Sequence, residues 1–445
     1  MIKQNLHSQR FVWILAAMIL LVRMPPVLAQ TPPAPSNDPA QEQSASAAPT
    51  DPAQAQPTCV PAPCPPPPQP ASEPRLEIYG YVMTDFGYDI NQINPDWFDV
   101  MRPSKLPSFH DEFGRNGRTF AGVRQTRNGI KGYIPTKYGE LKTTFEWELF
   151  GVGVDTGQTT FRLRHAYGEL GHWGAGQTWS PFMDPDIFPN SLEYWGPNGM
   201  VFFRNVQVRW MPLQGDTSVT VALERPGSSQ DPGLLANRIE ISNAFGRFQF
   251  PDVTGDIKTS HSWGYLRAAG IYGNTRIDDL RDDAVNLDQL VNRWGVDLTS
   301  NIKTGKKSVI KLGWVIGEGV ENYMNDAPVD IGPAPNFGNP VKPILAKPLP
   351  FKSLVAFWDV YWSDRWSSTI GYSQLAVANT PLQLPAEFKR GQYALTNLLW
   401  YPDENVMLGG EFQWGRRANF SDGFRVNDYK VQFSFKFSYF AKILK

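Results

Sequence analysis

The chain has 445 residues, which exceeds what one soluble core usually holds, although a single β-barrel domain can reach this length. Its 42 Lys and Arg residues are balanced by 43 Asp and Glu, so no overall positive charge draws it to nucleic acid or to an acidic membrane surface. Nucleic acid is therefore not an expected partner, and any functional charge must be local.

Residues 1–29 have the pattern of an export signal. Lys3 and Arg10 precede an apolar run over 11–22, and small residues at 27 and 29 precede the predicted cleavage site. The alternative is a retained membrane helix, but twelve apolar residues fall short of the roughly 20 that span a bilayer. No later run is long enough for such a helix, so a membrane role could come only from strands closed into a barrel.

Residues 30–74 predict an extended periplasmic tether. The segment consists mainly of Pro, Ala, Gln and Ser and lacks the apolar residues that a packed core requires. It is interpreted as a passive spacer or, alternatively, as a stiff arm that touches another component of the envelope. Cys59 and Cys64 lie in this segment, where a small-loop disulfide and an intersubunit bridge are both open. No metal-ligating partner lies near them in the sequence.

Residues 75–445 predict an all-β fold, a transmembrane antiparallel β-barrel. Segments of about ten residues alternate between apolar and polar side chains and are bounded by Gly, Pro, Asn or Asp. Apolar residues share one face over 140–149, 406–414 and 428–440, while charged and polar side chains share the other. In a soluble β-sandwich the apolar face would pack against a core. Aromatic residues near the segment ends and the low overall hydropathy favour lipid instead.

Connections between these segments alternate between short turns and long loops. Short turns are predicted at 135–139, 171–173, 211–216, 259–263, 304–307, 363–365 and 401–405. Long loops are predicted at 89–117, 151–159, 180–200, 225–247, 273–292, 318–350, 376–391 and 416–424. Seven turns and eight loops imply about sixteen strands, with short periplasmic turns and long extracellular loops. A barrel of this size leaves a water-filled lumen that inserted loops can narrow.

Basic side chains fall in phase with the polar faces of these strands. The positions expected to line the lumen are Arg127, Lys131, Lys142, Arg162, Arg164 and Arg209. The phase of 118–134 is the least certain, because Arg124 falls on the opposite face. The alternative is that these side chains are merely solvated or paired with Glu146, Glu148 and Glu169. A majority on the lipid face is disfavoured, because a charge there costs up to about 2–4 kcal/mol at mid-membrane.

Loop 180–200 has the opposite sign. It carries Asp184, Asp186 and Glu193 and no Lys or Arg, and it is rich in Pro and aromatic residues, which suits a loop packed against something. As the third long loop it occupies the place where general porins insert a constriction. The expected arrangement therefore has carboxylates facing a wall of Arg and Lys across a narrow aqueous gap.

Enzymatic motifs are missing from the sequence. It contains no G-x-S-x-G, no H-E-x-x-H, no phosphate-binding loop and no Rossmann glycine pattern. His165 and His172 flank a predicted turn without a ligand-spaced partner. We therefore expect no catalysis, no cofactor and no metal site.

Four stretches of the sequence resemble the DcaP-like porins of Gram-negative outer membranes. They are G-Y-I-P-T-K-Y-G-E-L-K-T, F-R-L-R-H-A-Y-G-E-L, G-A-G-Q-T-W-S-P-F-M-D and V-F-F-R-N-V-Q-V-R-W, and the similarity is strongest over 129–225. The resemblance implies a trimeric sixteen-stranded barrel, a signal peptide and passive uptake of small organic anions such as dicarboxylates. It carries over to Arg162, Arg164 and Arg209 as basic positions and to Asp184 in the constriction loop. The chain departs from the family in its Pro-rich tether, which replaces a coiled-coil-like segment.

These features predict a bacterial outer-membrane porin through which small hydrophilic solutes diffuse. The expected partners are outer-membrane lipid, small anionic solutes and further copies of the chain in a homotrimer. The alternatives are a structural or plugged barrel, an outer-membrane enzyme, and a soluble secreted β-sandwich. Single-channel conductance separates the porin from the plugged barrel, and a requirement for detergent excludes the sandwich.

Overall fold

The computed structural model describes residues 73–444. The predicted export signal, the tether up to residue 72 and both cysteines lie outside the described residues. The strands are β1 (Arg75–Asp89), β2 (Arg118–Gly122), β3 (Arg127–Thr136), β4 (Gly139–Phe150), β5 (Thr159–Leu170), β6 (Trp173–Trp179), β7 (Arg204–Leu213), β8 (Thr217–Glu224), β9 (Ala244–Arg247), β10 (Asp252–His261), β11 (Gly264–Asp279), β12 (Gln289–Lys303), β13 (Val309–Glu318), β14 (Ile331–Pro335), β15 (Ile344–Pro348), β16 (Pro350–Tyr361), β17 (Trp366–Val377), β18 (Phe388–Asp403), β19 (Val406–Asn419) and β20 (Arg425–Leu444).

Helical structure within the described range is limited to single 3-10 turns in the loops. They are η1 (Pro95–Trp97), η2 (Pro103–Lys105), η3 (Gly153–Asp155), η4 (Pro185–Ile187), η5 (Gly233–Leu235), η6 (Ile239–Ile241) and η7 (Glu321–Tyr323). Over residues 73–444, no helix has the length and apolar character needed to cross a membrane.

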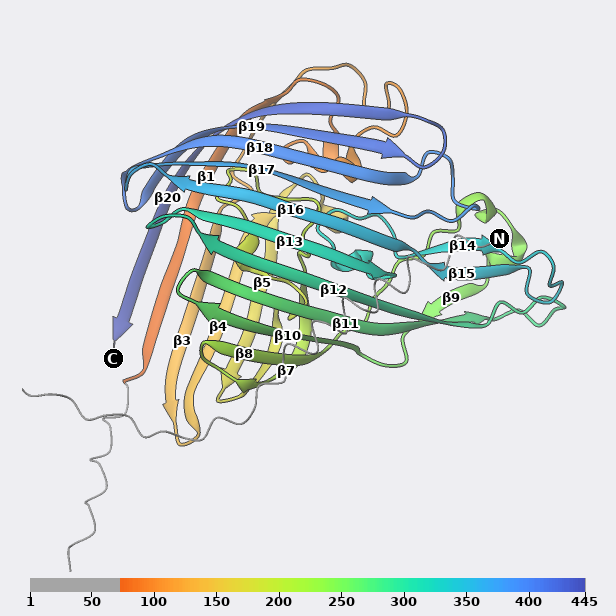
Figure 1. The fold of residues 1–445 in the computed structure, drawn as a ribbon, viewed down its shortest axis with the longest axis horizontal. Coiled ribbons are helices and arrows are strands. Elements are labelled where there is room, and N and C mark those ends of the chain that lie inside the picture. The colour runs from red at the N-terminus through yellow and green to blue at the C-terminus, as the bar shows by residue number, and fades with distance from the viewer. Residues whose placement is uncertain (1–72, 445) are drawn as a thin grey trace, which may run out of the picture. The chain divides into compact units, whose positions relative to one another are not determined.

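The strands form one closed antiparallel barrel (Figure 1). The main sheet has 18 strands, of which β2 and β3 together make one wall strand and β9 belongs to a loop, leaving 18 − 2 = 16 wall strands. Each wall strand pairs with its neighbours in chain order, and β1 pairs with β20 from Arg75 to Asp89 to close the ring. The predicted count of sixteen is confirmed. We call the end with short connections the turn end and the other the loop end.

The side-chain alternation of β20 confirms the prediction of which face points out of the barrel and which points inward. Phe433, Phe435 and Phe437 are 55%, 40% and 54% exposed on the outer surface, whereas Gln432 and Ser434 are buried inside the barrel. Because successive strand residues point to opposite faces, one apolar and one polar row follow from the sequence alone. The apolar row matches the band that a membrane barrel presents to lipid.

Three of the predicted long loops contain additional strand structure, and one of them, 225–247, ends in β9. β11 continues to Asp279 and β12 begins at Gln289, so the region expected to be a loop at 273–292 is mostly a paired hairpin. Loop 319–349 contains the β14–β15 hairpin, which pairs separately from the wall. The sequence did not distinguish these segments from loops, because strands at the loop end need no apolar face once they extend beyond the lipid.

A break at residues 123–126 explains the uncertain phase of the second wall strand. Thr126 N donates to Val123 O at 3.0 Å, forming a turn between β2 and β3. Arg124 is buried at this turn and donates to Asp99 at 2.5 Å and to Gly151 O at 3.0 Å. Alternation is interrupted at the turn, so Arg124 and Arg127 both point inward.

The apolar core lies inside the barrel, where loops fold inward from the loop end. Its buried members include Met101 from the first loop, Phe182 and Ile187 from the third, and Tyr323 from loop 319–349. Polar contacts join the same loops: Asp326 accepts from Arg102 Nε at 3.0 Å and from Ser104 N at 2.7 Å. The lumen is therefore narrowed by packed loops rather than by wall side chains alone.

Candidate functional site

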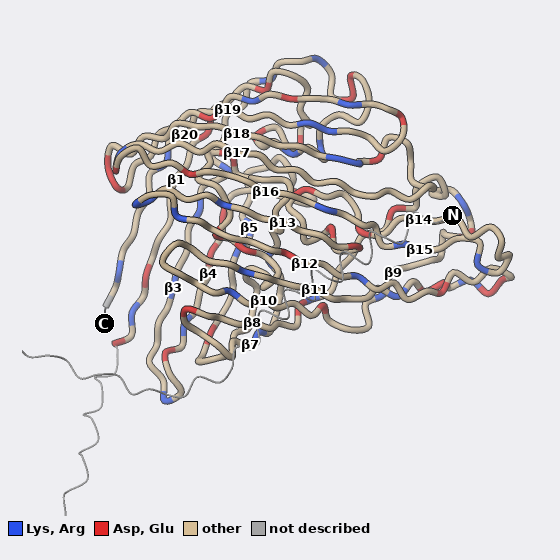
Figure 2. The backbone as a smooth tube through the Cα atoms, viewed as in Figure 1, with Lys and Arg blue, Asp and Glu red and all other residues tan. Residues whose placement is uncertain are grey.

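The inner face of β4 places two carboxylates among arginines from the neighbouring strands. Pairing sets Arg127 of β3 and Arg162 of β5 opposite Glu148 on either side. Arg127 lies 3.3 Å and Arg162 3.5 Å from Glu148 carboxylate oxygens, with side chains 24% and 27% exposed. Glu148 itself is fully buried. Lys, Arg, Asp and Glu positions lie close together along these strands (Figure 2).

A bulge in β5 brings Arg164 into the same cluster. β4 pairs Glu146 with His165 and Trp147 with Leu163, so Arg164 is an extra residue without a direct partner. Its guanidinium bridges both carboxylates, with 2.6 Å from Nε to Glu146 and 2.6 Å from Nη1 to Glu148. With a 3% exposed side chain, Arg164 is a buried link rather than a solvated charge.

Arg204 completes the cluster, and the sequence analysis missed it. Its guanidinium lies 3.7 Å from Glu148 and 4.8 Å above the ring of Trp179. Arg204 begins β7 in the opposite phase to Arg209, so alternation would have placed it outside. Only its position in the V-F-F-R-N stretch, which lies within the region of family resemblance, could have marked it. Arg127, Arg162, Arg164 and Arg204 against Glu146 and Glu148 leave a formal charge of 4 − 2 = +2.

The remaining predicted basic residues surround a cavity closer to the turn end. This lower cavity has a volume of about 350 Å³, and its lining includes Lys131, Lys142, Arg209, Glu146 and Glu169. Lys131 Nζ lies 4.9 Å above the ring of Tyr79. Arg209 donates to Gln207 Oε1 from Nε at 3.0 Å and from Nη2 at 2.8 Å. None of these three bases forms an ion pair with a described carboxylate. The alternative that the predicted basic residues are paired with glutamates therefore holds for Arg127, Arg162 and Arg164.

The loop between β6 and β7 crosses the inside of the barrel. Asp184 is buried and accepts from Tyr265 Oη at 2.7 Å and from Thr299 Oγ1 at 2.5 Å, on the side of β11 and β12. Further along, Leu192 N donates to Glu411 on β19 at 2.8 Å. The loop is therefore fastened to two separate parts of the wall.

The other two acids of the loop have different surroundings. Asp186 pairs with Lys258 Nζ of β10 at 2.5 Å, and its side chain is 53% exposed. Glu193 is buried and accepts hydrogen bonds from the backbone N–H groups of Met101, at 3.0 Å, and Gly196. Burial raises the pKa of Glu193 to about 8. Of the three predicted acids, Asp186 alone is well exposed.

An upper cavity lies between loop 180–203, which connects β6 to β7, and the inward-facing Arg and Lys side chains of β3 to β7, which we call the basic wall. It has a volume of about 280 Å³ and is lined by Arg127, Arg164 and Lys436 on the wall. The loop contributes Met183, Pro185, Phe188, Asn190, Ser191, Glu193 and Tyr194. The surface opposite the arginines is thus mainly apolar and neutral. Lys436 lies on the polar face of β20, where its alternation made it recognisable.

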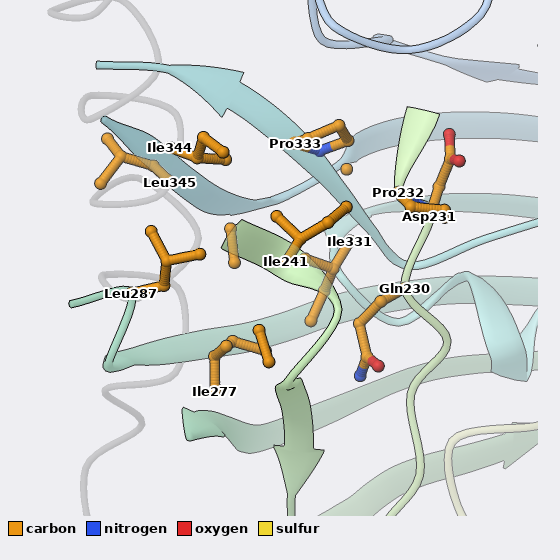
Figure 3. Close-up of a pocket in the computed structure, with 13 residues that line it drawn as sticks. Gln230, Asp231, Pro232, Ile241, Ile277, Leu287, Ile331, Pro333, Ile344 and Leu345 are labelled. Carbon is orange, nitrogen blue, oxygen red and sulfur yellow. The ribbon is translucent and has the colours of Figure 1, made fainter. Parts of the chain in front are cut away.

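A further cavity lies among the outer loops, away from the basic wall. It has a volume of about 260 Å³, and Ile277, Leu287, Ile331 and Ile344 are among its lining side chains (Figure 3). Gln230 and Asp231 supply its polar edge. Asp231 already accepts from Gly233 N and Gln383 Nε2, so this cavity offers little beyond apolar packing.

Metal-ligand chemistry finds no support in the described range. Over residues 73–444, no group of three or more His, Cys, Asp or Glu side chains is arranged to hold a metal ion. His165 instead contacts Thr178 through Nδ1 at 2.9 Å, with Nε2 3.9 Å from Glu146.

The chain is similar to a known family of outer membrane proteins and to a solved channel structure. A family profile described as DcaP outer membrane protein matches residues 68–326, which include the predicted region of resemblance at 129–225. The crystal structure of the outer membrane channel DcaP of Acinetobacter baumannii is similar with a TM-score of 0.68 and 20% identity, covering 83% of this chain and 98% of that one. A search of curated proteins gave no match.

Two more distant solved structures share the fold. The anion-selective porin from Comamonas acidovorans has a TM-score of 0.54 and 10% identity, covering 82% of this chain and 100% of that one. The trimer form of in-vitro folded OmpT, an outer membrane protein of Vibrio cholerae, has a TM-score of 0.50 and 9% identity, with coverages of 83% and 100%. At such identities the likeness concerns the fold.

Proposed function

The chain belongs to the DcaP outer membrane protein family, and on that premise we propose that it is a passive diffusion channel that prefers small organic anions such as dicarboxylates. The observation that carries the proposal is the excess of arginine over carboxylate at Glu148, continued by three bases around the lower cavity. The loop end faces the outside of the cell and the turn end faces the periplasm, as in other bacterial barrels.

The proposed path runs from the upper cavity to the lower one along β3, β4, β5 and β7. An anion first meets Arg127 and Arg162, whose partly exposed forks can each donate two parallel hydrogen bonds to a carboxylate. Lys131, Lys142 and Arg209 then hold it near the lower cavity. Because Glu148 compensates part of the charge, binding stays weak enough for release.

The loop acids serve this path indirectly. Asp184 and Glu193 fasten loop 180–203 through buried hydrogen bonds, so their role in the proposal is to position the constriction. Asp186 is the one acid of the three exposed enough to oppose the basic wall electrostatically. We propose that no residue on this path is catalytic and that the channel uses no cofactor.

We also propose how the protein assembles and how it is exported. We propose a homotrimer surrounded by outer-membrane lipid, which is consistent with the trimer form of the similar Vibrio cholerae protein. Residues 1–29 act as a cleaved signal peptide, and 30–74 form a periplasmic tether in which Cys59 and Cys64 are able to pair.

Solute uptake into liposomes tests the anion preference. Wild-type protein should admit a four-carbon dicarboxylate faster than a neutral diol of equal size. An Arg127→Gln, Arg162→Gln variant should lose most of this difference, because it removes the two partly exposed guanidinium groups. The barrel should still fold, because Arg164 and Arg204 keep Glu148 paired. Arg238→Gln, Arg247→Gln is the matched control, since both arginines are exposed in outer loops and pair with acids. An unchanged dicarboxylate preference in the first variant would rule out the basic wall as its cause.

A plugged barrel is the second candidate, favoured by the apolar core that three loops build inside the barrel. A plugged barrel should give no conductance steps in a planar bilayer, because its lumen is closed, whereas a porin should give them. Regular single-channel steps would exclude the plugged barrel, and their absence from correctly folded protein would exclude the porin.

A further inference from the structure

A basic patch lies on the outer surface of the barrel, at the loop ends of β18, β19 and β20. Arg390, Arg416 and Arg425 point outward there, with Lys389 beside them at the end of β18. Together they line a groove of about 460 Å³. Figure 2 marks several Lys and Arg positions toward the loop ends of these strands. We call Lys389, Arg390, Arg416 and Arg425 the outer basic patch.

Strand pairing aligns this patch in two rows across the sheet. Arg390 is opposite Ala418, which is in turn opposite Arg425, so two arginines flank one small residue. In the next row Arg416 stands between Gln392 and Asn427. Adjacent strands are about 4.8 Å apart, so the three guanidiniums surround a shallow groove above Ala418 that is wide enough for a phosphate-sized group.

None of the four basic side chains of the patch forms an ion pair with a carboxylate among residues 73–444. Arg390, Arg416 and Arg425 form no ion pair and no side-chain hydrogen bond within the described structure. The neighbouring Arg417, which points inward, differs completely: it donates to Asn419 Oδ1, Ser104 O and Ala386 O at 2.8 to 2.9 Å. Of these two adjacent arginines on β19, Arg417 is therefore anchored inside the barrel, while Arg416 has no partner among the described residues.

The position of the patch relative to the apolar surface indicates what meets it. The next row toward the turn end holds Ala394, Trp414 and Tyr429, and beyond it come Phe412 and Phe433. Aromatic residues of this kind mark the boundary between lipid tails and headgroups. Charges on the outer face cost little near that boundary, so the patch lies at headgroup level.

We propose that the outer basic patch binds the phosphates of an anionic phosphorylated lipid in the outer leaflet. Arg suits this ligand because its planar fork donates two hydrogen bonds to a phosphate, while the acyl chains extend over Phe412 and Phe433. Lys352 is exposed in the same row, since it pairs with Ala376, which pairs with Arg390. It extends the positive surface toward a second lipid. The inference needs only the barrel in its membrane and is independent of solute preference.

Native mass spectrometry of the detergent-purified full chain tests this assignment. The protein is titrated with lipid A carrying two phosphates, with the same lipid after dephosphorylation, and with inorganic phosphate. Wild type should retain the phosphorylated lipid, and Arg390→Gln, Arg416→Gln, Arg425→Gln should weaken retention on the order of tenfold or more, because each charge contributes to attraction. The single Arg416→Gln variant should show an intermediate loss.

A control with equal loss of charge separates the patch from net charge. Lys137→Gln, Lys306→Gln, Arg365→Gln removes three bases at turns of the opposite end and should retain lipid as wild type does. The assignment is overturned if the patch variants keep the lipid, or if the dephosphorylated lipid or inorganic phosphate binds equally well. It is also overturned if the patch variant loses subunits while each remaining subunit retains its lipid, because the patch would then be a contact between copies.

Discussion

On the β3–β7 side of the lumen, four arginines surround two glutamates, whereas on the β10–β12 side the arginines are buried against aspartates. Arg293 lies 2.7 Å from Asp252, and neither side chain is exposed. Arg267 contacts Asp256 at 3.1 Å and Asp297 at 3.7 Å, with only 5% of its side chain exposed. Arginine is thus in excess on the first side and matched by acid on the second.

The difference shows how one residue type can serve transport or anchoring. Arg267 also donates to the carbonyl oxygens of Pro181 and Met183, so the β10–β12 side fastens the inserted loop. On the other side, Arg127 and Arg162 keep about a quarter of their side-chain surface exposed, and Arg127 lines the upper cavity. A charge whose partners are complete cannot attract a passing solute, whereas an incompletely compensated one can.

The largest effect should come from breaking a buried pair. Arg293→Met leaves the Asp252 carboxylate buried without its partner, which should destabilise the barrel by about 3–5 kcal/mol. The temperature at which the folded barrel loses its heat-modifiable migration should fall, while the ion selectivity of surviving channels stays the same. Arg127→Met is the comparison variant: its partly exposed pair should contribute about 1 kcal/mol or less. Equal thermal losses in the two variants would contradict the division between the two sides.

An intermediate effect should follow from ionising Glu193. Its pKa of about 8 lies above the ordinary value of 4.5 because of burial, so the stabilisation is complete below pH 4.5 and is lost as pH rises through 8. Lys430 opposes this shift, while Glu411 adds to it, and Tyr393 shares the same surroundings. Wild-type channels should therefore show more current noise at pH 9 than at pH 6, because loop 180–203 is held less firmly.

The isosteric variant Glu193→Gln is the control for that pH dependence. It keeps the side-chain volume and a carbonyl acceptor for Met101 N but cannot ionise. Its current noise should be the same at pH 6 and pH 9. A variant that retains the wild-type pH response would show that another group titrates.

The smallest effect is expected at Asp186. Its pair with Lys258 is exposed, so Asp186→Asn should change stability by about 1 kcal/mol or less. Removing this carboxylate should make the channel slightly more anion-selective. Asp184→Asn, which disturbs two buried hydrogen bonds, should cost more stability without that gain in selectivity. Reversal potentials and thermal melts of both variants would show whether the ranking holds.

Much of the fold was predictable because alternation with period two is a local property of the sequence. The last strand separates an aromatic row from a polar row without knowledge of any contact, and short and long connections alternate along the whole chain. The ends of β11 and β12 were not predictable in this way. Beyond the lipid a paired strand and a polar loop have the same composition, and only the partner strand distinguishes them.

The site was less predictable because its chemistry depends on pairing between strands. Alternation indicated Arg162 and Arg164 as inward residues, but it gave no sign that a bulge makes Arg164 a buried bridge between two glutamates. Arg204 lies out of phase at the start of its strand. The acids of loop 180–203 were visible as a cluster, yet whether each faces the lumen or a hydrogen-bond donor is decided by how the loop folds.

The reversal potential of the channel in a KCl gradient tests the central claim most directly. Wild-type protein should be anion-selective at low salt, and Arg127→Gln, Arg162→Gln should shift the potential toward cations. The difference should shrink at 1 M salt, where the screening length falls to about 3 Å. A wild-type channel that is cation-selective at low salt, or a variant with unchanged potential, would contradict the assignment of anion preference to this wall.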